Sequence, residues 1–251
     1  MVQSVLRLTL VVTVLFQCVP AMAQRGGRGA GPPGANAPNE GRGQGGPSLK
    51  IERDVEYARP GGQPLTLDLY HLEPLASPRP VVVWIHGTGS GATKLTTPAV
   101  ALVSPTGVAV ASIDYRTTPG TTLQMQLGDA KSAIRWLRVN ASKYNLDSAH
   151  IAVFGYGVGG QLAALLGTTS GVSTLEGDEG NLGQSSQVQA VVDVAGAMTT
   201  GGLNPVDYVT KDDAPTRIIH GTNDTEVSTM PDADLRAESG GNQRDVRNAR
   251  G

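Results

Sequence analysis

The first residues with a clear chemical use form a glycine-rich segment, HGTGSG at residues 86–91, which directly follows the apolar run VVVWI. A turn with few side chains lets backbone N–H groups approach a developing negative charge, which is what an oxyanion hole requires. The amides of Gly87, Thr88 and Gly89 are therefore candidates for oxyanion binding. The same pattern is also compatible with a plain turn between a strand and a helix.

A second glycine-rich segment, GYGVGG at residues 155–160, follows the apolar run IAVF. Gly155, Gly157 and Gly160 match the Gly-x-Gly-x-x-Gly fingerprint of dinucleotide-binding proteins, although an isolated fingerprint of this kind is a weak signal. A nucleotide-binding fold also needs a following strand that ends in Asp or Glu and holds the ribose. Glu176 stands near the required position, but the sequence around it, STLEGDEGN, is not typical of a strand.

Five mostly continuous apolar runs predict the strands that position these segments, because strands buried on both faces of a parallel sheet have this pattern. The runs lie at residues 81–85, 108–113, 151–154, 188–194 and 217–219. Helical patterns separate several of them, so we predict an α/β fold with a mostly parallel twisted sheet and flanking helices. Two runs that alternate apolar and polar residues, 51–57 and 64–70, predict an N-terminal antiparallel hairpin around Pro60-Gly61-Gly62.

An apolar stripe at helical spacing indicates the main crossover helix of this fold. The residues of the stripe are Leu127, Ala130, Ile134, Leu137 and Ala141. Lys131, Arg135 and Arg138 fall on the other faces of the same helix. A second helix is predicted over residues 160–166, directly after the second glycine-rich segment.

The N-terminal residues have the three parts of a signal peptide. A weakly basic start ends at Arg7, the apolar run LTLVVTVLF follows, and Ala21-Met22-Ala23 forms a small-residue cleavage boundary. The apolar run is too short to span a bilayer. We therefore predict that residues 1–23 are removed and that the protein is exported to the periplasm or the extracellular space. Cys18, the single cysteine, would be lost with them, which excludes disulfides and thiolate zinc sites in the mature protein.

Composition divides the remaining chain into three parts. Residues 24–48 are nearly all Gly, Pro, Ala, Arg and Asn and cannot bury enough apolar surface to fold, so we expect a disordered linker. Residues 49–230 form the predicted α/β domain, and residues 231–251 form an irregular tail. The formal net charge of −2 gives no long-range field that would attract nucleic acid or an anionic membrane, so neither partner is expected for the mature protein.

Six blocks of the sequence resemble, in order, the α/β-hydrolases that include bifunctional feruloyl and acetyl xylan esterase-like proteins. The blocks are PRPVVVWIHGTG, VAVASIDYR, AKSAIRWLRVNASKYNLD, HIAVFGYGVGGQLAALLGTTSG, LEGDEGNLGQSSQVQAVVDVAG and YVTKDDAPTRIIHGTND. The resemblance runs from about residue 65 to residue 227. It implies an α/β-hydrolase fold and a carboxylic-ester hydrolase lineage, with a small-molecule or polysaccharide-linked ester as substrate or ligand. Fold alone does not establish activity.

The resemblance also implies where the catalytic residues should stand. The apolar run at residues 151–154 should lead into Gly-x-Ser-x-Gly, a strained turn that exposes the serine nucleophile. Gly157 occupies that position and has no hydroxyl group to form an acyl-enzyme. Val158, the next residue, would add a backbone amide to the oxyanion hole. Asp224 matches the triad acid, whose role is to orient a histidine.

The triad histidine should follow the acid along the chain, but residues 225–251 contain none. The four histidines of the sequence are His71, His86, His150 and His220, and each has an ordinary structural explanation. For His86, that explanation is that its ring pins the glycine-rich loop. The last residues, SGGNQRDVRNARG, resemble nothing in the family, so we expect a truncation or a shifted reading frame. The last strand and helix of the fold would then be missing.

The sequence therefore predicts an exported protein of esterase lineage that is catalytically impaired or inactive. Two alternatives stay open: a non-catalytic ligand-binding protein that retains the cleft, and a degraded copy without function. Dinucleotide binding through the second glycine-rich segment is a further alternative. No cluster of His, Asp and Glu has ligand spacing, so we expect no metal and no cofactor.

Overall fold

The computed structural model of this 251-residue chain describes residues 47–89, 92–198, 202–221 and 247–249. The predicted signal peptide, nearly all of the predicted linker and most of the predicted tail lie outside the described residues. Asp224 lies outside them as well. The described residues cover nearly all of the predicted α/β domain up to Gly221.

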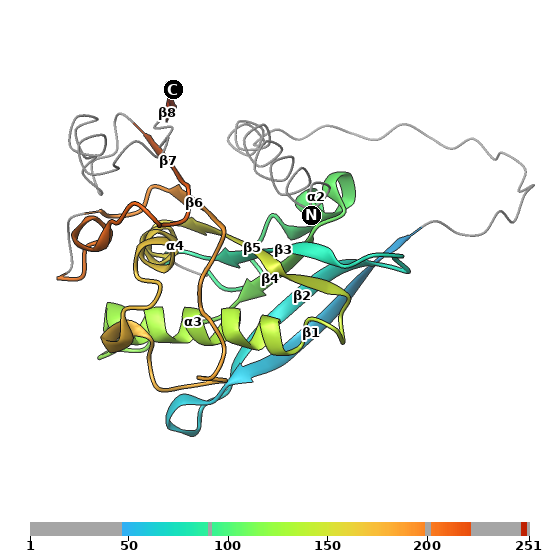
Figure 1. The fold of residues 1–251 in the computed structure, drawn as a ribbon, viewed down its shortest axis with the longest axis horizontal. Helices are drawn as coiled ribbons and strands as arrows, with labels where there is room; N and C mark the ends of the chain where they lie inside the picture. The colour runs from blue at the N-terminus through green and yellow to red at the C-terminus, as the bar shows by residue number, and fades with distance from the viewer. Residues whose placement is uncertain (1–46, 90–91, 199–201, 222–246, 250–251) are drawn as a thin grey trace, which may run out of the picture.

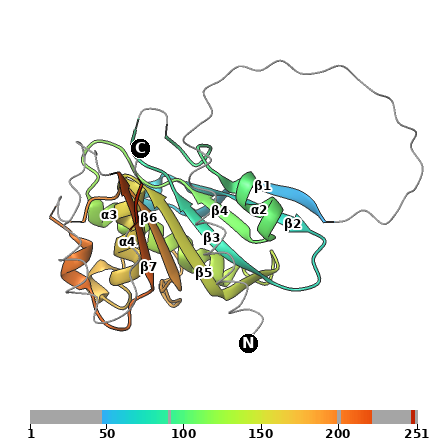
Figure 2. The same ribbon diagram turned by 90° about the horizontal axis from the view of Figure 1, so that it is seen from above.

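Eight strands form one sheet in the order β1-β2-β4-β3-β5-β6-β7-β8 (Figures 1 and 2). The strands are β1 (Ser48–Ala58), β2 (Leu65–Glu73), β3 (Arg79–Ile85), β4 (Ala109–Ile113), β5 (Leu146–Tyr156), β6 (Ala190–Val194), β7 (Thr216–Gly221) and β8 (Arg247–Ala249). The strands from β4 to β8 in this order are parallel, and the β1–β2 hairpin joins β4 in the antiparallel direction. The predicted mostly parallel sheet with an N-terminal hairpin is confirmed.

The far edge of the sheet corrects one expectation. The sequence predicted that the last strand is missing, yet β8 pairs in parallel with β7, with Ile219 opposite Arg247 and Gly221 opposite Ala249. Backbone hydrogen bonds alone define so short an edge strand. Its three residues, Arg247-Asn248-Ala249, carry no apolar pattern that predicts a strand. Residues 222–246, where the predicted missing helix would lie, are outside the described residues.

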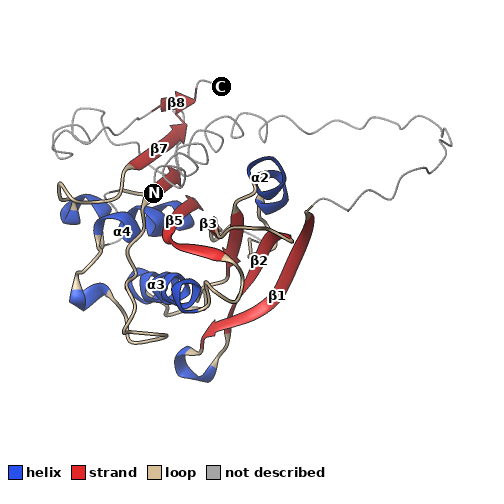
Figure 3. Cartoon of the chain, turned by 45° about the vertical axis from the view of Figure 1, so that its right-hand side comes forward, coloured by secondary structure: helices blue, strands red, loops and turns tan. Residues whose placement is uncertain are grey.

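Helices cover both faces of the sheet (Figure 3). They are α2 (Ala99–Thr106), α3 (Leu123–Val139) and α4 (Val158–Thr168), with 3-10 turns η1 (Pro60–Gly62), η2 (Ser173–Leu175) and η3 (Pro205–Tyr208). Leu127 of α3 and Leu162 of α4 are buried in the apolar cluster on one face, and Leu102 and Val103 of α2 are buried in the cluster on the other. The two predicted helices are confirmed. The sequence did not predict α2, because AVALVSPT has no alternation of apolar and polar faces.

The helix α3 also buries charged side chains. The pattern placed Lys131 and Arg135 opposite the apolar stripe, but both are fully buried, because the chain between α4 and β6 covers them. Glu176 of that segment contacts both, with Oε1 2.8 Å from Lys131 Nζ and Oε2 3.2 Å from Arg135 Nη1. Burial lowers the pKa of Lys131, and the hydrogen bond that its ammonium group donates to Glu176 opposes part of that shift. Residues 169–187 are thus tied to α3 by charge as well as by packing.

Candidate active site

The turn after β5 carries the position predicted for the nucleophile. β5 ends at Tyr156, α4 begins at Val158, and Gly157 joins them with φ 58° and ψ −124°. Glycine adopts this conformation freely, whereas a residue with a side chain is strained in it. The Gly157 N–H donates to the Val194 carbonyl at 2.9 Å, which fixes the turn to the end of β6. A sharp strand-to-helix turn is therefore present, without a hydroxyl group at its tip.

The flanking glycines let the backbone pack closely around this turn. A Cβ atom on Gly155 would lie 1.9 Å from the Gly159 carbonyl oxygen, and one on Gly159 would lie 2.1 Å from the Ile85 carbonyl oxygen. Both positions need glycine, because these distances are far below van der Waals contact. A Cβ atom on Gly157 would meet only the Gly87 Cα atom, at 3.9 Å, which is an ordinary contact. Space for a side chain exists at Gly157, and only its backbone conformation disfavours one.

The loop after β3 lies beside the turn, because β3 and β5 are parallel neighbours that end at the same edge of the sheet. Gly87 is the residue of this loop that faces Gly157. The Gly89 carbonyl accepts a hydrogen bond from the Ala92 N–H at 2.9 Å, which closes the loop beyond Thr88. The structure thus brings the predicted oxyanion loop and the predicted nucleophile position together. Oxyanion binding by these amides stays a prediction.

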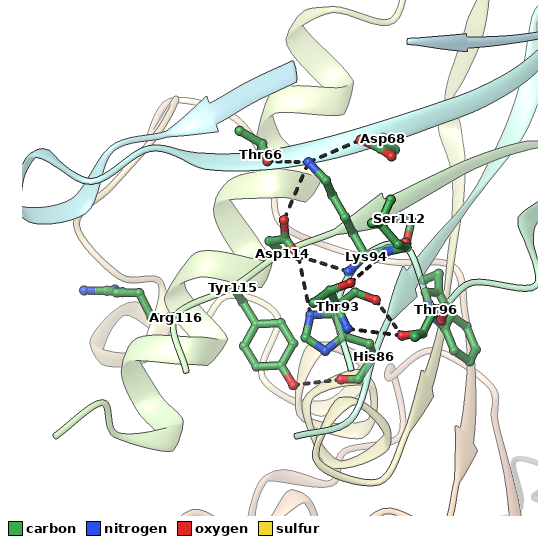
Figure 4. A network of polar contacts seen from close by, with 12 residues as sticks. Thr66, Asp68, His86, Thr93, Lys94, Thr96, Ser112, Asp114, Tyr115 and Arg116 are labelled. Carbon is green, nitrogen blue, oxygen red and sulfur yellow. Dashed lines mark hydrogen bonds and ion pairs between the residues drawn. The ribbon is translucent and has the colours of Figure 1, made fainter. Parts of the chain in front are cut away.

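His86 fixes the orientation of the loop (Figure 4). Its Nδ1 atom lies 2.7 Å from the Gly87 carbonyl oxygen, and its own carbonyl accepts a hydrogen bond from the Tyr115 hydroxyl at 2.7 Å. The Tyr115 ring stacks on the imidazole, with ring centroids 4.7 Å apart. The C=O and N–H groups of a trans peptide point in opposite directions, so this contact turns the Thr88 N–H away from the His86 ring. These contacts agree with the interpretation that His86 pins the loop.

Lys94 links the chain that follows the loop to the N-terminal hairpin through a group of carboxylates (Figure 4). Its ammonium group lies 2.6 Å from Asp54 Oδ1, 3.2 Å from Asp68 Oδ1 and 3.6 Å from Asp114 Oδ2. Asp114 Oδ1 also accepts the Lys94 N–H at 3.0 Å and lies 3.7 Å from His86 Nε2. Burial favours the neutral form of Asp114, but the contacts with His86 and Lys94 outweigh it and lower the pKa. Sequence reasoning missed this group, although SIDYR places a carboxylate directly after a buried strand.

The other histidines have different positions in the sheet. His71 lies on β2 with Nδ1 3.7 Å from Glu73, and burial lowers its pKa. His150 lies on β5 with Nδ1 2.8 Å from Asp147. Both lie toward the end of the sheet at which the parallel strands begin, opposite the end that carries the Gly157 turn. His220 lies near the end of β7, at the same edge as the turn, and is buried.

Asp193, which the sequence analysis did not identify, is a fully buried acid beneath the Gly157 turn. Its Oδ1 atom accepts the Gly196 N–H at 2.9 Å, and its Oδ2 atom has no hydrogen-bond partner within the part of the chain that the structure describes. Burial raises the pKa of Asp193 to about 7, although the Gly196 hydrogen bond acts in the opposite direction. A Cβ atom on Gly160 would lie 2.1 Å from Oδ1. The first turn of α4 therefore rests directly on this carboxyl group.

Glu176 does not stand where a ribose-binding carboxylate would. It directly follows η2 rather than a strand, and it pairs with Lys131 and Arg135. The geometry therefore gives no support to dinucleotide binding.

The role of Asp224 as triad acid stays a prediction, because this residue lies outside the described part of the chain. Within residues 47–89, 92–198, 202–221 and 247–249, no group of three His, Cys, Asp or Glu side chains could hold a metal ion. In the same ranges, every helix is too short or too polar to cross a membrane.

Comparison with known proteins relates this fold to esterases. The family model described as BD-FAE matches residues 67–203. Esterase LipC of Mycobacterium tuberculosis is 32% identical over 127 residues, which cover 47% of this chain but only 30% of LipC. A truncated form of a carbohydrate esterase from gut microbiota is 26% identical with a TM-score of 0.65, covering 78% of this chain and 85% of that one. A bifunctional GH43-CE protein of Bacteroides eggerthii is 30% identical with a TM-score of 0.68, covering 79% and 32%.

Proposed function

The chain belongs to the BD-FAE family of α/β-hydrolase esterases, and from this premise we propose that it binds carboxylic esters or acids without hydrolysing the esters. The observation that carries the proposal is Gly157. The strand-to-helix turn is in place, and its tip has no hydroxyl group. Without that nucleophile, no acyl-enzyme forms at this turn.

Ligand binding would survive the loss of the serine because the donors are backbone groups. The loop that carries Gly87, Thr88 and Gly89 is held by His86 and Tyr115, and none of these contacts involves a side chain at position 157. A carbonyl or carboxylate oxygen is the acceptor that such amides suit. The proposed ligands are therefore small-molecule or polysaccharide-linked esters and the acids derived from them.

Hydrolysis of p-nitrophenyl acetate tests the absence of turnover. We expect a rate equal to the buffer background, and no covalent labelling by a fluorophosphonate that reacts with activated serines. Turnover with no labelling would show another mechanism, and labelling would show another activated serine. Either result would contradict the proposal.

Retained binding is tested by titrating the 15N-labelled chain with phenylphosphonate, a tetrahedral anion. We expect saturable shifts of the Thr88 and Gly89 amide signals. Gly157→Leu should abolish them, because its side chain would start 3.9 Å from the Gly87 Cα atom and enter the site. Gly61→Leu is the matched control, since Gly61 has the same φ of 58° and no atom within 4 Å of its Cβ position. Unchanged binding by Gly157→Leu would contradict the proposed site.

Export is the second part of the proposal, and it is supported by the three-part pattern of residues 1–23. Mass spectrometry of the protein recovered outside the cytoplasm of its native host tests it. We expect a mature chain that begins at Gln24. Recovery of a chain that retains Met1 would contradict export by cleavage.

A further inference from the structure

A concave site lies between the first turns of α3 and the segment that follows α4. It is a pocket of about 410 Å³, within the range of small-molecule sites, and its lining residues include neither the Gly157 turn nor the loop after β3. Arg116, in its wall, projects away from the His86 network (Figure 4). We propose that this pocket binds one unit of a neutral, hydroxyl-rich ligand such as a sugar ring. The proposal uses other residues than the proposed ester site and does not depend on it.

Two glycines that line the pocket pack against each other. Gly128 of α3 lies against Gly177, and a Cβ atom on Gly177 would be 2.9 Å from the Gly128 Cα atom. Gly177 also has φ 72°, which disfavours a side chain. Next to it, Glu176 is held by the buried Lys131 and Arg135. The position of the Glu176-Gly177 segment is therefore fixed by close backbone packing and by a buried ionic cluster.

The pocket presents hydrogen-bond donors and acceptors together. The Arg116 guanidinium is held by Asp129, with Nε 2.9 Å from Oδ2 and Nη2 2.7 Å from Oδ1. The Thr122 side chain accepts the Met125 N–H at 3.2 Å, whereas the preceding N–H groups of Leu123 and Gln124 have no acceptor within the helix. The acceptors are the carboxylates of Asp178 and Glu179. The Asp129 hydrogen bonds are the main cause that raises the pKa of Arg116, and the charges of Glu179 and Asp178 add to it, so both acids lie near this guanidinium.

This mixture of groups favours hydroxyl ligands over ions. An anion only accepts hydrogen bonds and would be repelled by Asp178 and Glu179, while a cation only donates and would be repelled by Arg116. A hydroxyl group does both, so several hydroxyls on one ring can use the donors and the acceptors at once. Among the lining residues that the structure describes, Met125 alone has an apolar side chain, and it is 38% exposed. A large apolar ligand is therefore a poor fit, whereas one C–H face of a sugar ring suits Met125.

The test is a titration of the 15N-labelled full chain with three probes: methyl β-D-glucopyranoside, methyl β-D-xylopyranoside and methyl β-D-galactopyranoside. We expect at least one of them to shift the Gly128, Gly177 and Gln124 amide signals in a saturable way, with a millimolar dissociation constant. Asp178→Ala should weaken this binding on the order of tenfold, as expected for loss of a charged hydrogen-bond acceptor. Asp212→Ala removes an acid that is also exposed and that pairs with Lys211 outside the pocket, and it should have no effect.

Three results would overturn the proposal. The first is the absence of saturable shifts with all three glycosides up to about 50 mM, since a millimolar dissociation constant would give saturation below that concentration. The second is stronger binding of spermidine or sulfate at the same signals, which would make this an ion site. The third is unchanged affinity in both Asp178→Ala and Glu179→Ala. Circular dichroism of the variants confirms folding, and exposure of Asp178 makes a folding defect unexpected.

Discussion

Replacement of Gly157 by alanine separates backbone strain from steric clash at the turn. The new Cβ atom would have one ordinary contact at 3.9 Å, so clash contributes almost nothing. The conformation with φ 58° and ψ −124° is sparsely populated by residues with side chains, and holding one there costs about 1–3 kcal/mol. We expect Gly157→Ala to lower the free energy of unfolding by about 2 kcal/mol. Gly157→Ser should match it within about 0.5 kcal/mol, because the hydroxyl group adds no buried contact.

Two control variants make this measurement decisive. Gly61→Ala has the same φ of 58° but ψ 22°, an ordinary left-handed conformation, and should cost about 1 kcal/mol. Gly155→Ala places a Cβ atom 1.9 Å from a carbonyl oxygen and should cost far more than either. Urea unfolding followed by circular dichroism gives all four values. If Gly157→Ala costs no more than Gly61→Ala, the strained turn does not exist in solution and the assignment of the nucleophile position is wrong.

Three further predictions concern activity, buried charge and pH. Gly157→Ser alone should give no hydrolysis of p-nitrophenyl acetate, because a serine without a base is a poor nucleophile. The His86 ring is already in contact with the loop and with a carboxylate. Measurable turnover would identify a base in this chain. Glu176→Ala should lower the free energy of unfolding by about 3 kcal/mol, since it leaves two buried cations without their carboxylate, and a urea midpoint equal to that of Asp212→Ala would contradict this. Asp193 has a folded pKa of about 7, raised from 3.8, so the folded chain holds this proton more tightly and stability falls as pH rises from about 4 to about 7. Asp193→Asn should flatten that fall and make the chain more stable than the parent at pH 8, and an unchanged slope of urea midpoint against pH would contradict it.

The sequence predicts those elements of the fold in which the pattern of apolar residues indicates which side chains are buried. The run VVVWI gives β3, and the stripe that includes Leu127 and Ile134 gives α3, because the apolar pattern of each depends only on its own neighbours. The proximity of Gly87 and Gly157 was also predictable, since parallel neighbouring strands end at one edge. A short edge strand such as β8 and a helix such as α2 carry no such pattern.

Groups that depend on tertiary contact could not be predicted in the same way. Lys94 reaches Asp54 and Asp68 of the hairpin, which are distant in the sequence, and nothing local to Lys94 indicates either partner. Periodicity likewise identified Lys131 as polar without indicating that a later segment would cover it. The burial of Asp193 reflects the close approach of α4, which is made possible by Gly160.

The order of the central strands has a consequence for what survives when catalysis is lost. The chain leaves β3 toward α2 on one face of the sheet and leaves β5 toward α4 on the other, so the two connections diverge between adjacent strands. Open α/β sheets form a crevice at such a topological switch point, whatever residues line it. Such a crevice is set by strand order and helix placement, and no reactive side chain is needed to form it. Mutation can therefore remove the chemistry of such a protein in one step, whereas removing its cleft would require rebuilding the sheet.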